Sequence, residues 1–526
     1  MVDSQAWGEG RSRRGRSYLV CGAVLALTVS FTGVEIANGT PGRGEGGAPG
    51  ERWAPGPAGA GSRIGWKPCE GDASAECGAL SVPVDWGKPD GERFDLQLAR
   101  RRATGPGARA GSLVFGPGGP GDSGVNRIVG AGNMGRFSDN LRSRFDIVSF
   151  DPRGVGLSNP IRCSQELLDR RPSPVMKSRA EFNATAKYNH ELREDCRKNT
   201  ENGLFDHVDT LSMVKDLDAV RAALGEKSLT FHGSSYGTLL GAQYAEQYPE
   251  RVRALVLEAV VDHSLGTGEF LATQAATLQD SFDEFVAWCE RTESCALHGS
   301  DVRALWADLL DRAGRGELSY DGRALTRFDL SVMVMKRLYG PERARLGQEL
   351  RGMKESVPEA AQVAEVVETA QAAGTTAGGS GTALGENAFE IFCQDWSLPV
   401  RGYQGYAREL RRVSSIAADM KYPRALMAVS ACLGAPEPDN PQHRLKVRTS
   451  RPILLTHSLH DPASGYDWAT HVAEQLGSSA VLHTYEGWGH GTYSSSPCVQ
   501  ETVDAYLVSL KVPARGAGCP AVEPAG

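Results

Sequence analysis

Six short apolar runs, each ending at a glycine, an aspartate or a histidine, constrain the fold of this chain more than any other feature. Stretches with helical spacing separate them, and this alternation is typical of a mostly parallel sheet with crossover helices. In such sheets the carboxyl ends of the strands carry the chemistry. We therefore expect a doubly wound α/β fold with its functional residues at the strand ends. The runs are SLVFGPGG, FDIVSFDPRG, SLTFHGSSYG, ALVLEAVVD, PILLTHSLHD and AVLHTYEGWGH.

Between residues 264 and 446 the strand pattern disappears and helical segments such as LATQAATLQDSFDEFVAWCE replace it. Strand-like runs resume at Pro452. We therefore expect one sheet that is interrupted by a mainly helical cap (264–446), inserted between the sixth and seventh strands, rather than two successive domains. The two parts of the core then cover residues 63–263 and 447–526.

The first 39 residues are interpreted as an export signal. Arginines between residues 11 and 16 precede an apolar stretch that is too short and too interrupted for a membrane span, so no stable span is expected in the mature chain. The segment SRRGRSYLV is similar to a twin-arginine signal. Cys21 lacks a convincing lipobox, which favours a secreted product over a lipid-anchored one. Residues 40–62, rich in Gly, Pro and Ala, are predicted to form a disordered linker.

The composition indicates an ordinary soluble globular protein with a mildly acidic surface. The hydrophobic share is 40% and the net charge is −7. Basic residues are not interleaved with aromatic ones, so no nucleic-acid partner is expected.

The cysteine count favours disulfides. Of eleven cysteines, ten remain once Cys21 is removed with the signal, and an even number outside the cytosol is typical of a disulfide-bonded protein. No CxxC motif or His/Cys cluster has the spacing of zinc ligands, so we predict no metal. The spacing suggests local pairs, although other pairings stay open: Cys69 with Cys77, Cys163 with Cys196, Cys289 with Cys295, Cys393 with Cys432, and Cys498 with Cys519.

The segment Gly233–Gly237 matches the pattern G-x-S-x-G, in which a nucleophilic serine sits on a sharp strand-to-helix turn. The five-residue pattern is weak evidence in a chain with 62 glycines. Its context is stronger, because it follows the strand-like SLTFH and precedes the helix-like TLLGAQYAEQY. We predict that Ser235 is a nucleophile and that Ser234 is structural.

A serine nucleophile needs an imidazole to take its proton and a carboxylate to orient that imidazole. Both are expected after later strands, in the order Ser, Asp, His. Asp461 follows the run PILLTHS and His490 follows AVLHTY, so these two residues complete the predicted triad. Asp262 and Asp395 are the rival acids. His457 and His460 flank Asp461, but no further ligands accompany them for a metal site.

The oxyanion formed during acyl transfer needs preorganised N–H donors. One is expected from Tyr236, beside the nucleophile, and a second from Gly118 and Gly119 in the run SLVFGPGGPGDSG. Residues 116–121 also spell G-x-G-x-x-G, the dinucleotide fingerprint. Two prolines in this stretch remove donors that a pyrophosphate would need, which leaves an oxyanion loop or a plain Gly-Pro turn as its role.

With these residues in place, the chain resembles the tripeptidyl aminopeptidase branch of the prolyl aminopeptidase-like α/β hydrolases, known from secreted actinobacterial serine peptidases. The resemblance extends over most of the chain after the linker. It implies the α/β-hydrolase fold, no cofactor, and the triad and oxyanion residues named above. Relatives commonly have Asp-Pro-Val-Thr-Pro at the acid, where this chain has DPASG, and Pro117 replaces the usual leading His of the oxyanion motif. The motifs that carry the resemblance are GPGGPG, FDIVSFDPRGVGLS, GSSYGT, the Asp-Pro pair at 461 and 462, WGHGTY and YLVSLKVPARGAGC.

We therefore expect a secreted serine exopeptidase that hydrolyses peptide bonds near a free N-terminus. A carboxylate in the helical cap is the natural partner of the substrate ammonium group. Glu386, Glu390 and Asp395 in GENAFEIFCQDW are candidates, and each is equally well explained as a surface or helix-cap carboxylate. An esterase or lipase with the same triad is the alternative, followed by a non-catalytic binding protein on this fold.

Overall fold

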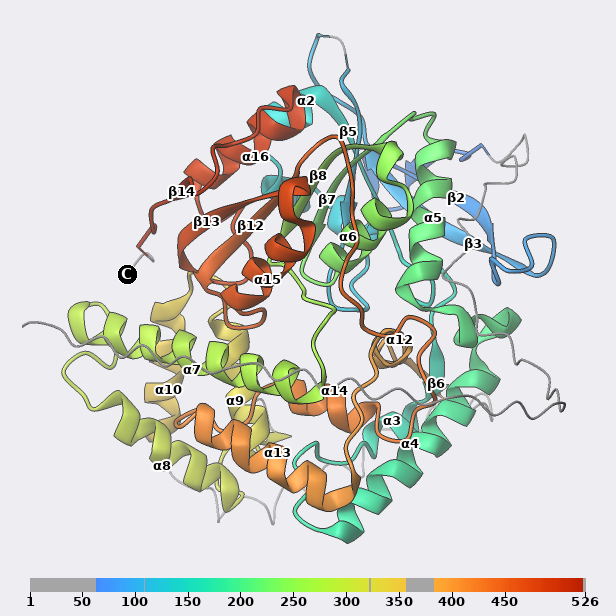
Figure 1. Ribbon diagram of the computed structural model, residues 1–526. Coiled ribbons are helices and arrows are strands. Elements are labelled where there is room, and N and C mark those ends of the chain that lie inside the picture. Colours follow the sequence, from blue (N-terminus) through green and yellow to red (C-terminus); the bar gives the residue numbers. More distant parts are fainter. Residues whose placement is uncertain (1–62, 108, 321–322, 356–382, 524–526) are drawn as a thin grey trace, which may run out of the picture. The chain divides into compact units, whose positions relative to one another are not determined.

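The computed structural model describes residues 63–107, 109–320, 323–355 and 383–523. The expected signal peptide (1–39) and linker (40–62) lie outside these residues. The main sheet has ten strands in the spatial order β1-β2-β3-β5-β4-β7-β8-β12-β13-β14 (Figure 1). Their bounds are β1 (Lys67–Cys69), β2 (Asp72–Pro83), β3 (Arg93–Arg101), β4 (Gly111–Gly116), β5 (Phe145–Phe150), β7 (Leu229–Ser234), β8 (Val252–Glu258), β12 (Ile453–His460), β13 (Ala480–Trp488) and β14 (Gly518–Cys519).

The sheet is mostly parallel, as expected. Strands β1, β2 and β3 pair antiparallel with their neighbours, whereas every pair from β5 through β4, β7, β8, β12 and β13 to β14 is parallel. From β4 the chain first runs outward to β5 and then crosses back to β7 on the other side. Ligands bind at such a reversal, outside the carboxyl ends of the strands. The ends of β4 and β7 therefore frame the candidate site.

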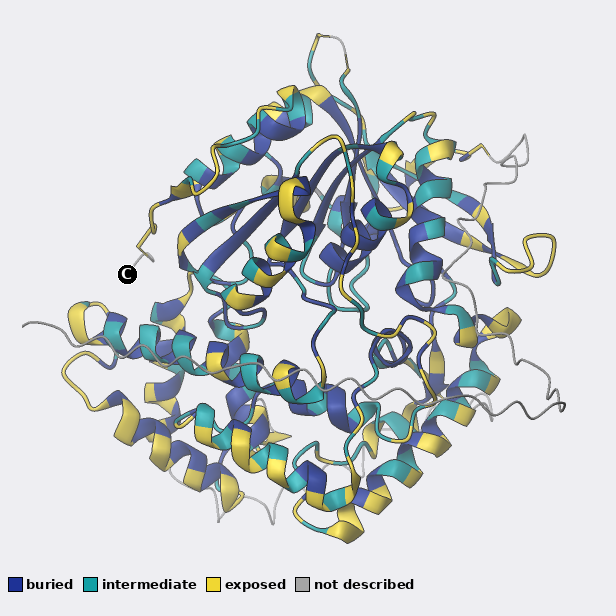
Figure 2. Ribbon diagram, viewed as in Figure 1, coloured by how far each residue is buried: buried dark blue, intermediate teal, exposed yellow. Residues whose placement is uncertain are grey.

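Side chains alternate between two hydrophobic cores, one on each face of the sheet. In β4, Val114 belongs to one core while Leu113 and Phe115 belong to the other, as the two-residue period of a strand requires. Figure 2 shows these strands buried along their central length. Helices cover both faces, so the strands read as almost continuous apolar runs. The first face carries α5 (Thr210–Ala223), α6 (Gly237–Gln247) and α15 (Tyr466–Leu476), and the second carries α1 (Val125–Ile128), α2 (Asp139–Arg144) and α16 (Pro497–Ser509).

Helices dominate the chain between β8 and β12, where the helical cap was expected. Leaving aside the three-residue β1, these are the sixth and seventh strands of the main sheet. The longest helix, α7 (Thr267–Arg291), contacts α13, α14 and β12, and its apolar side joins the core of the first face. Among the described residues of this stretch, the other helices are α8 (Val302–Gly314), α9 (Arg327–Arg337), α10 (Arg343–Glu355), α12 (Phe389–Asp395), α13 (Gly402–Ile416) and α14 (Ala425–Ala431), with the short pair β9 (Ser319–Tyr320) and β10 (Arg323–Ala324).

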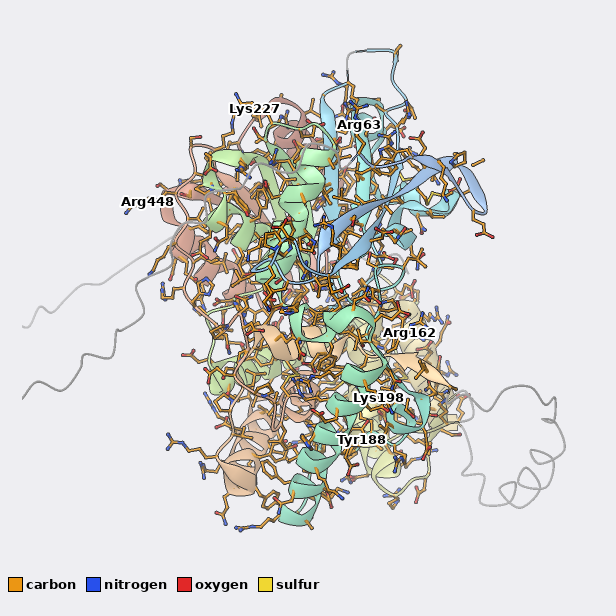
Figure 3. All side chains as sticks on the ribbon, turned by 90° about the vertical axis from the view of Figure 1, so that its right-hand side faces the viewer. Arg63, Arg162, Tyr188, Lys198, Lys227 and Arg448 are labelled. Atoms are coloured by element: carbon orange, nitrogen blue, oxygen red, sulfur yellow. A yellow bond between two sulfur atoms is a disulfide. The ribbon has the colours of Figure 1, made fainter. Side chains whose placement is uncertain are left out.

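One segment departs from the expected division of the chain. Residues 162–199 were assigned to the core, but β6 (Arg162–Ser164) pairs with β11 (Leu384–Glu386) of the cap, and α4 (Arg179–Asn199) contacts α13. The short α3 (Gln165–Asp169) contacts β11 as well. Figure 3 labels Arg162 on β6 and Tyr188 and Lys198 on α4. Two separate stretches of sequence therefore build the helical layer, because an isolated amphipathic helix such as α4 needs a partner for its apolar face.

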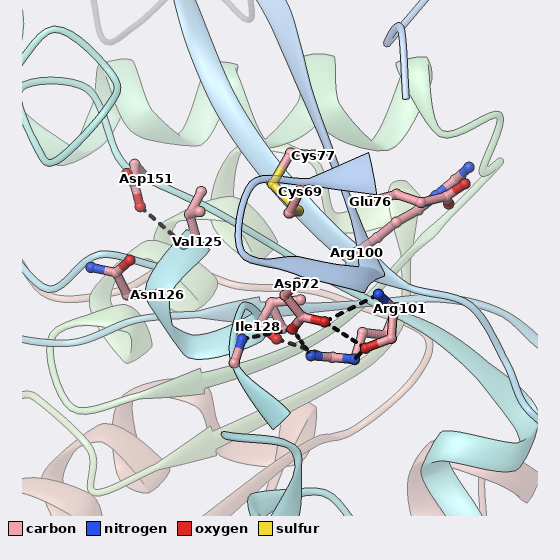
Figure 4. Close-up of a disulfide and its surroundings, with 12 residues drawn as sticks. Cys69, Asp72, Glu76, Cys77, Arg100, Arg101, Val125, Asn126, Ile128 and Asp151 are labelled. Carbon is pink, nitrogen blue, oxygen red and sulfur yellow. Dashed lines mark hydrogen bonds and ion pairs between the residues drawn. A yellow bond between two sulfur atoms is a disulfide. The ribbon is translucent and has the colours of Figure 1, made fainter. Parts of the chain in front are cut away.

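All five expected disulfide pairings are confirmed within the described residues. Cys163–Cys196 joins β6 to α4, and Cys393–Cys432 joins α12 to the end of α14, so both bonds lie in the helical layer. Figure 4 shows Cys69–Cys77 at the sheet edge, near the ion pair between Asp72 and Arg101. The remaining bonds are Cys289–Cys295 and Cys498–Cys519.

Among the described residues, no helix combines the length and the apolar character that crossing a membrane requires.

Candidate active site

Ser235 occupies a strained turn between β7 and α6. Its φ is +55°, in the left-handed region that non-glycine residues seldom adopt, and its N–H donates to the carbonyl oxygen of Glu258 at 2.9 Å. A Cβ at Gly233 would lie 2.4 Å from the carbonyl oxygen of Gly237, and a Cβ at Gly237 would lie 2.4 Å from that of Gly116. Glycine is therefore required at both positions. The turn has the geometry of a nucleophile elbow, in which strain exposes the serine side chain.

Ser235 and His490 line the same cavity, of about 100 Å³. His490 Nδ1 lies 3.0 Å from Asp461 Oδ1 and 2.9 Å from Oδ2, so the ring is held by its Nδ1 side and Nε2 is left for the nucleophile. The Ser235 hydroxyl makes no hydrogen bond to any described residue, and catalytic hydrogen bonds in unliganded sites often form only on substrate binding. The structure thus brings together the serine, histidine and aspartate that the sequence singled out.

Asp461 is fully buried, and its carboxylate accepts several hydrogen bonds. Ala463 N–H (2.8 Å), Ser464 N–H (3.0 Å) and Ser464 Oγ (3.0 Å) all donate to its carboxylate. Burial opposes ionisation, but the charge and hydrogen bond of His490 outweigh it and lower the pKa of Asp461. Ser464 in the segment DPASG thus supplies both a backbone and a hydroxyl donor to the acid.

The pKa of His490 is shifted in the opposite direction. Burial alone would lower it, but the charge of Asp461 and its hydrogen bond raise the pKa, and the charge of Glu258 adds to the rise. Tyr339 also fixes the position of His490. The His490 N–H donates to the carbonyl oxygen of Tyr339 at 2.9 Å, and the centroids of the two rings are 4.7 Å apart. A residue of the helical layer therefore helps to set the orientation of this imidazole.

Glu258, the last residue of β8, was not among the residues predicted from sequence. Its Oε1 accepts hydrogen bonds from the N–H groups of Thr492 (2.5 Å) and Tyr493 (2.6 Å), and its Oε2 lies 3.1 Å from His232 Nε2. Although burial opposes it, these hydrogen bonds and the charge of His232 lower the pKa of Glu258 to about 2. Glu258 thus contacts the serine turn through its backbone carbonyl and the segment after His490 through its carboxylate. A charged residue inside the apolar run ALVLEAVVD was the signal for it.

The expected oxyanion donors surround the serine. A Cβ at Gly118 would lie 2.9 Å from Ser235 Cβ, so this loop can approach the nucleophile closely only as glycine, and Gly119 lines the cavity itself. No described residue accepts a hydrogen bond from the N–H groups of Gly118, Gly119 or Tyr236. These donors are available to an oxyanion, as the chemistry requires.

The three carboxylates expected to bind a substrate ammonium group lie in different environments. Glu386 is exposed on β11 and lines neither cavity near the serine. Glu390 is buried and contacts Arg193 Nη1 with both oxygens, at 2.5 and 2.6 Å. It lines a second cavity, of about 340 Å³, which shares Phe389 with the cavity at Ser235.

Asp395 is not available to a substrate. It is fully buried and accepts hydrogen bonds from Thr210 N–H (2.7 Å), Thr210 Oγ1 (2.6 Å), Tyr236 Oη (2.5 Å) and Asn440 Nδ2 (2.8 Å). Burial raises the pKa of Asp395 to about 7. Its contacts hold the Tyr236 ring, which is a structural role next to the nucleophile rather than recognition of the substrate amine.

Aromatic side chains form a large part of the lining of the cavity at Ser235. Phe392 and Trp396 stack with ring centroids 5.3 Å apart, and Phe270 bridges Trp396 (5.0 Å) and Trp468 (5.8 Å). No aspartate or glutamate is among the described residues that line it, and Arg424 contributes a positive charge. All of these side chains except Trp468 come from between β8 and β12, where periodicity gave no sign of a shared cavity.

The remaining rival acid, Asp262, and the two flanking histidines have hydrogen-bond partners of their own, although His457 Nε2 also lies 3.7 Å from Asp461 Oδ2. Asp262 accepts hydrogen bonds from Ser264 N–H and Oγ, at 3.0 and 2.6 Å. His457 accepts from Val260 N–H at 3.0 Å and lies 2.8 Å from the carbonyl oxygen of Ser464, while His460 lies 2.9 Å from Asp280. Each side chain has a local structural partner.

Two family models match the chain: that of the alpha/beta hydrolase fold over residues 111–327, and that of the TAP-like proteins over residues 420–519. The chain is 32% identical over 485 residues to the serine protease Hip1 of Mycobacterium tuberculosis, an alignment that covers 87% of this chain and 91% of the relative. The chain belongs to the tripeptidyl aminopeptidase-like α/β hydrolases. The expected family and fold are therefore confirmed.

Two further relatives differ in their stated activity. The hydrolase is 29% identical over 539 residues to tripeptidyl aminopeptidase of Streptomyces lividans, which covers 96% of this chain and 97% of the relative. It is 29% identical over 469 residues to carboxylesterase B of Mycobacterium tuberculosis, which covers 85% and 86%. Membership of this family makes the protein a serine hydrolase.

Proposed function

We propose that this hydrolase is a secreted serine exopeptidase that cleaves peptide bonds near a free N-terminus through an acyl-enzyme intermediate. The observation that carries the proposal is the convergence of Ser235, on its strained turn, with the His490–Asp461 pair in one aromatic cavity. Two relatives, aligned over 87% and 96% of this chain, are named a serine protease and a tripeptidyl aminopeptidase, and these names support a peptide substrate.

In the proposed mechanism, His490 Nε2 removes the proton of the Ser235 hydroxyl as Oγ attacks the substrate carbonyl carbon. The negative charge that develops on the carbonyl oxygen is stabilised by N–H groups of Tyr236 and of the Gly118–Gly119 loop. The protonated His490 then donates to the leaving amine, so the C–N bond breaks and the acyl-enzyme remains. A water molecule, deprotonated by His490, hydrolyses the ester and regenerates Ser235. Asp461 stabilises the imidazolium in both halves of the reaction.

A free N-terminus is proposed to be recognised beyond the aromatic cavity. Of the three candidate carboxylates, Glu390 lines a cavity, and that cavity adjoins the one at Ser235 through Phe389. An acyl chain of a few residues could extend from Ser235 into this second space, where a carboxylate is the natural partner of an ammonium group. Arg193 already neutralises Glu390, so an ammonium group would share the carboxylate with it.

Secretion is supported by the disulfides. Five bonds within the described residues favour an oxidising compartment, because thiols stay reduced in the cytosol. Export by the arginine-containing N-terminal segment remains our proposal.

An esterase is the second candidate, since the aromatic cavity would also accept an apolar acyl group and one relative is named a carboxylesterase.

A substrate panel distinguishes the two. Turnover of short peptide amides with free N-termini, of the same peptides acetylated, and of short acyl esters would be measured for the mature protein. We expect free peptides to be preferred, and Ser235→Ala to lower kcat/KM by about 10³-fold or more while the neighbouring Ser234→Ala does not. Hydrolysis of esters alone would establish the esterase instead, and equal turnover of acetylated peptides would remove the exopeptidase assignment.

A further inference from the structure

Arg424 places a positive charge in the cavity that contains Ser235 and His490. It immediately precedes α14, whose Ala425 and Ala428 also line this cavity. Its guanidinium forms no ion pair with any carboxylate of the described residues, whereas most of the described arginines lie within 4 Å of one. A positive charge without a counter-charge in a cavity is costly unless a ligand or solvent compensates for it.

The neighbours of Arg424 do not supply that counter-charge. Tyr339 lies beside it, and burial raises the pKa of this phenol, so its oxygen is neutral at ordinary pH. His490 is the other basic side chain in the lining, and the charge of Arg424 opposes protonation of its ring. The cavity wall has no aspartate or glutamate in the part of the chain that the structure describes. The guanidinium of Arg424 is therefore available to attract an anionic group of a ligand in this cavity.

Arg424 lies on the side of the cavity where the leaving group of a bound substrate would be. Phe392, one of the aromatic side chains in the cavity, lies beside Tyr236, with the two ring centroids 6.2 Å apart. This places it on the side of the nucleophile and the oxyanion loop. Arg424 and Tyr339 instead lie by His490, the group that must hand a proton to the leaving amine. Residues around this imidazole therefore face the leaving group rather than the acyl chain.

We infer that Arg424 binds a carboxylate of the leaving group, so that the preferred substrates are short peptides with an anionic group just beyond the scissile bond. The guanidinium presents paired N–H donors that match a carboxylate, and such charge-assisted hydrogen bonds give both orientation and affinity. Arg424 is a specificity residue in this arrangement. The inference rests on the proposed peptidase function and narrows it to one class of peptide.

The carboxylate could come from two sources. It is the C-terminal carboxylate when the leaving group is one residue long, or an aspartate or glutamate side chain when the leaving group continues. Three otherwise identical peptides separate these sources: a tetrapeptide acid, its C-terminal amide, and an amide with aspartate at the last position.

The experiment measures kcat/KM for each peptide, with products identified by mass spectrometry, in the wild type and in Arg424→Gln. We expect the wild type to prefer the free acid, the aspartyl amide, or both, over the neutral amide by about 10- to 100-fold, as for hydrogen bonds to charged groups. Arg424→Gln should abolish this preference mainly through KM, and Arg424→Lys should restore part of it. Arg411→Gln removes an exposed arginine outside the cavity and should change nothing.

A binding measurement keeps the inference separate from the proposed function. Calorimetry with the Ser235→Ala variant reports the affinity for the same peptides without turnover. If the wild type cleaves none of them but this variant binds the anionic peptides more tightly, the peptidase function fails and the role of Arg424 stands. Equal affinity for acid and amide, or a preference that survives Arg424→Gln, would overturn the inference.

Discussion

The Glu258 carboxylate accepts the backbone N–H of Thr492 at 2.5 Å, two residues beyond His490 in the loop that follows β13. The same residue accepts the N–H of Ser235 through its own carbonyl oxygen. One buried residue therefore connects the turn of the nucleophile to the loop of the base, and its charge also raises the pKa of His490.

Replacing Glu258 by Gln should shift the pH profile. The enzyme needs neutral His490, so activity falls as pH decreases through the pKa of that ring. Removing the negative charge lowers this pKa, and the acid limb of kcat/KM should move to lower pH while the amide oxygen still accepts from the loop. The pH dependence of kcat/KM checks this, and an unchanged acid limb together with reduced activity would leave Glu258 a purely structural role.

The same variant should alter acid stability. The pKa of Glu258 is lowered from 4.5 to about 2, so its ionisation stabilises the folded state fully above about pH 4.5 and ceases to do so as pH falls toward 2. Urea unfolding between pH 2 and 6 should show this loss in the wild type. In Glu258→Gln that part of the pH dependence should be missing. If the unfolding free energy fell equally with pH in both proteins, the lowered pKa of Glu258 would be contradicted.

Asp461→Asn should lower kcat by about 10⁴-fold with little change in KM, because the ring is no longer held in the tautomer that leaves Nε2 as acceptor. The acid limb should also move to lower pH, since Asp461 raises the pKa of His490. Asp262→Asn is the matched control at the rival acid, which accepts hydrogen bonds from Ser264 and Gln475 and lies 3.4 Å from His471 Nδ1. If Asp262→Asn had the larger effect on kcat, the proposed triad would be wrong.

Tyr236→Phe should separate the side chain of Tyr236 from its backbone. The phenol donates to buried Asp395, so its loss should cost about 1–3 kcal/mol of unfolding free energy. The backbone N–H proposed to face the oxyanion is retained, and kcat should stay within a few-fold of the wild type. Thermal unfolding and steady-state kinetics measure both effects. A loss of activity at unchanged stability would assign the phenol itself to the reaction.

Removing the Cys163–Cys196 disulfide by a double alanine substitution should destabilise the helical layer. The bond spans 33 residues, and loop-closure entropy for that length is worth about 4 kcal/mol. Denaturant unfolding should report the loss, with the Cys69–Cys77 pair, which spans 8 residues, as a control of smaller effect. If removal of either disulfide lowered the unfolding free energy equally, the length of the closed loop would not determine how much each disulfide stabilises the protein.

Local sequence patterns predicted six of the ten strands of the main sheet, the turn of the nucleophile and the order of the candidate triad, whereas β1, β2, β3 and β14 were not among the six apolar runs. A short apolar run and a glycine-flanked serine are short-range signals, because each depends on only a few neighbouring residues. The disulfide pairs were predictable on a different ground, because each joins two cysteines that follow one another as successive cysteines along the chain. The roles of Ser235, Asp461 and His490 stay predictions that the observed geometry supports.

Tertiary structure alone decided what surrounds these residues. Glu258 and Thr492 are 234 residues apart, and Tyr236 and Asp395 are 159 apart, so no periodicity relates them. The segment containing α4 belongs to the helical layer because α4 packs against α13. Asp395 is not available to a substrate because it is buried and accepts hydrogen bonds from other residues of the protein. Such contacts depend on how distant apolar faces pack, which is a property of the whole chain rather than of any local pattern.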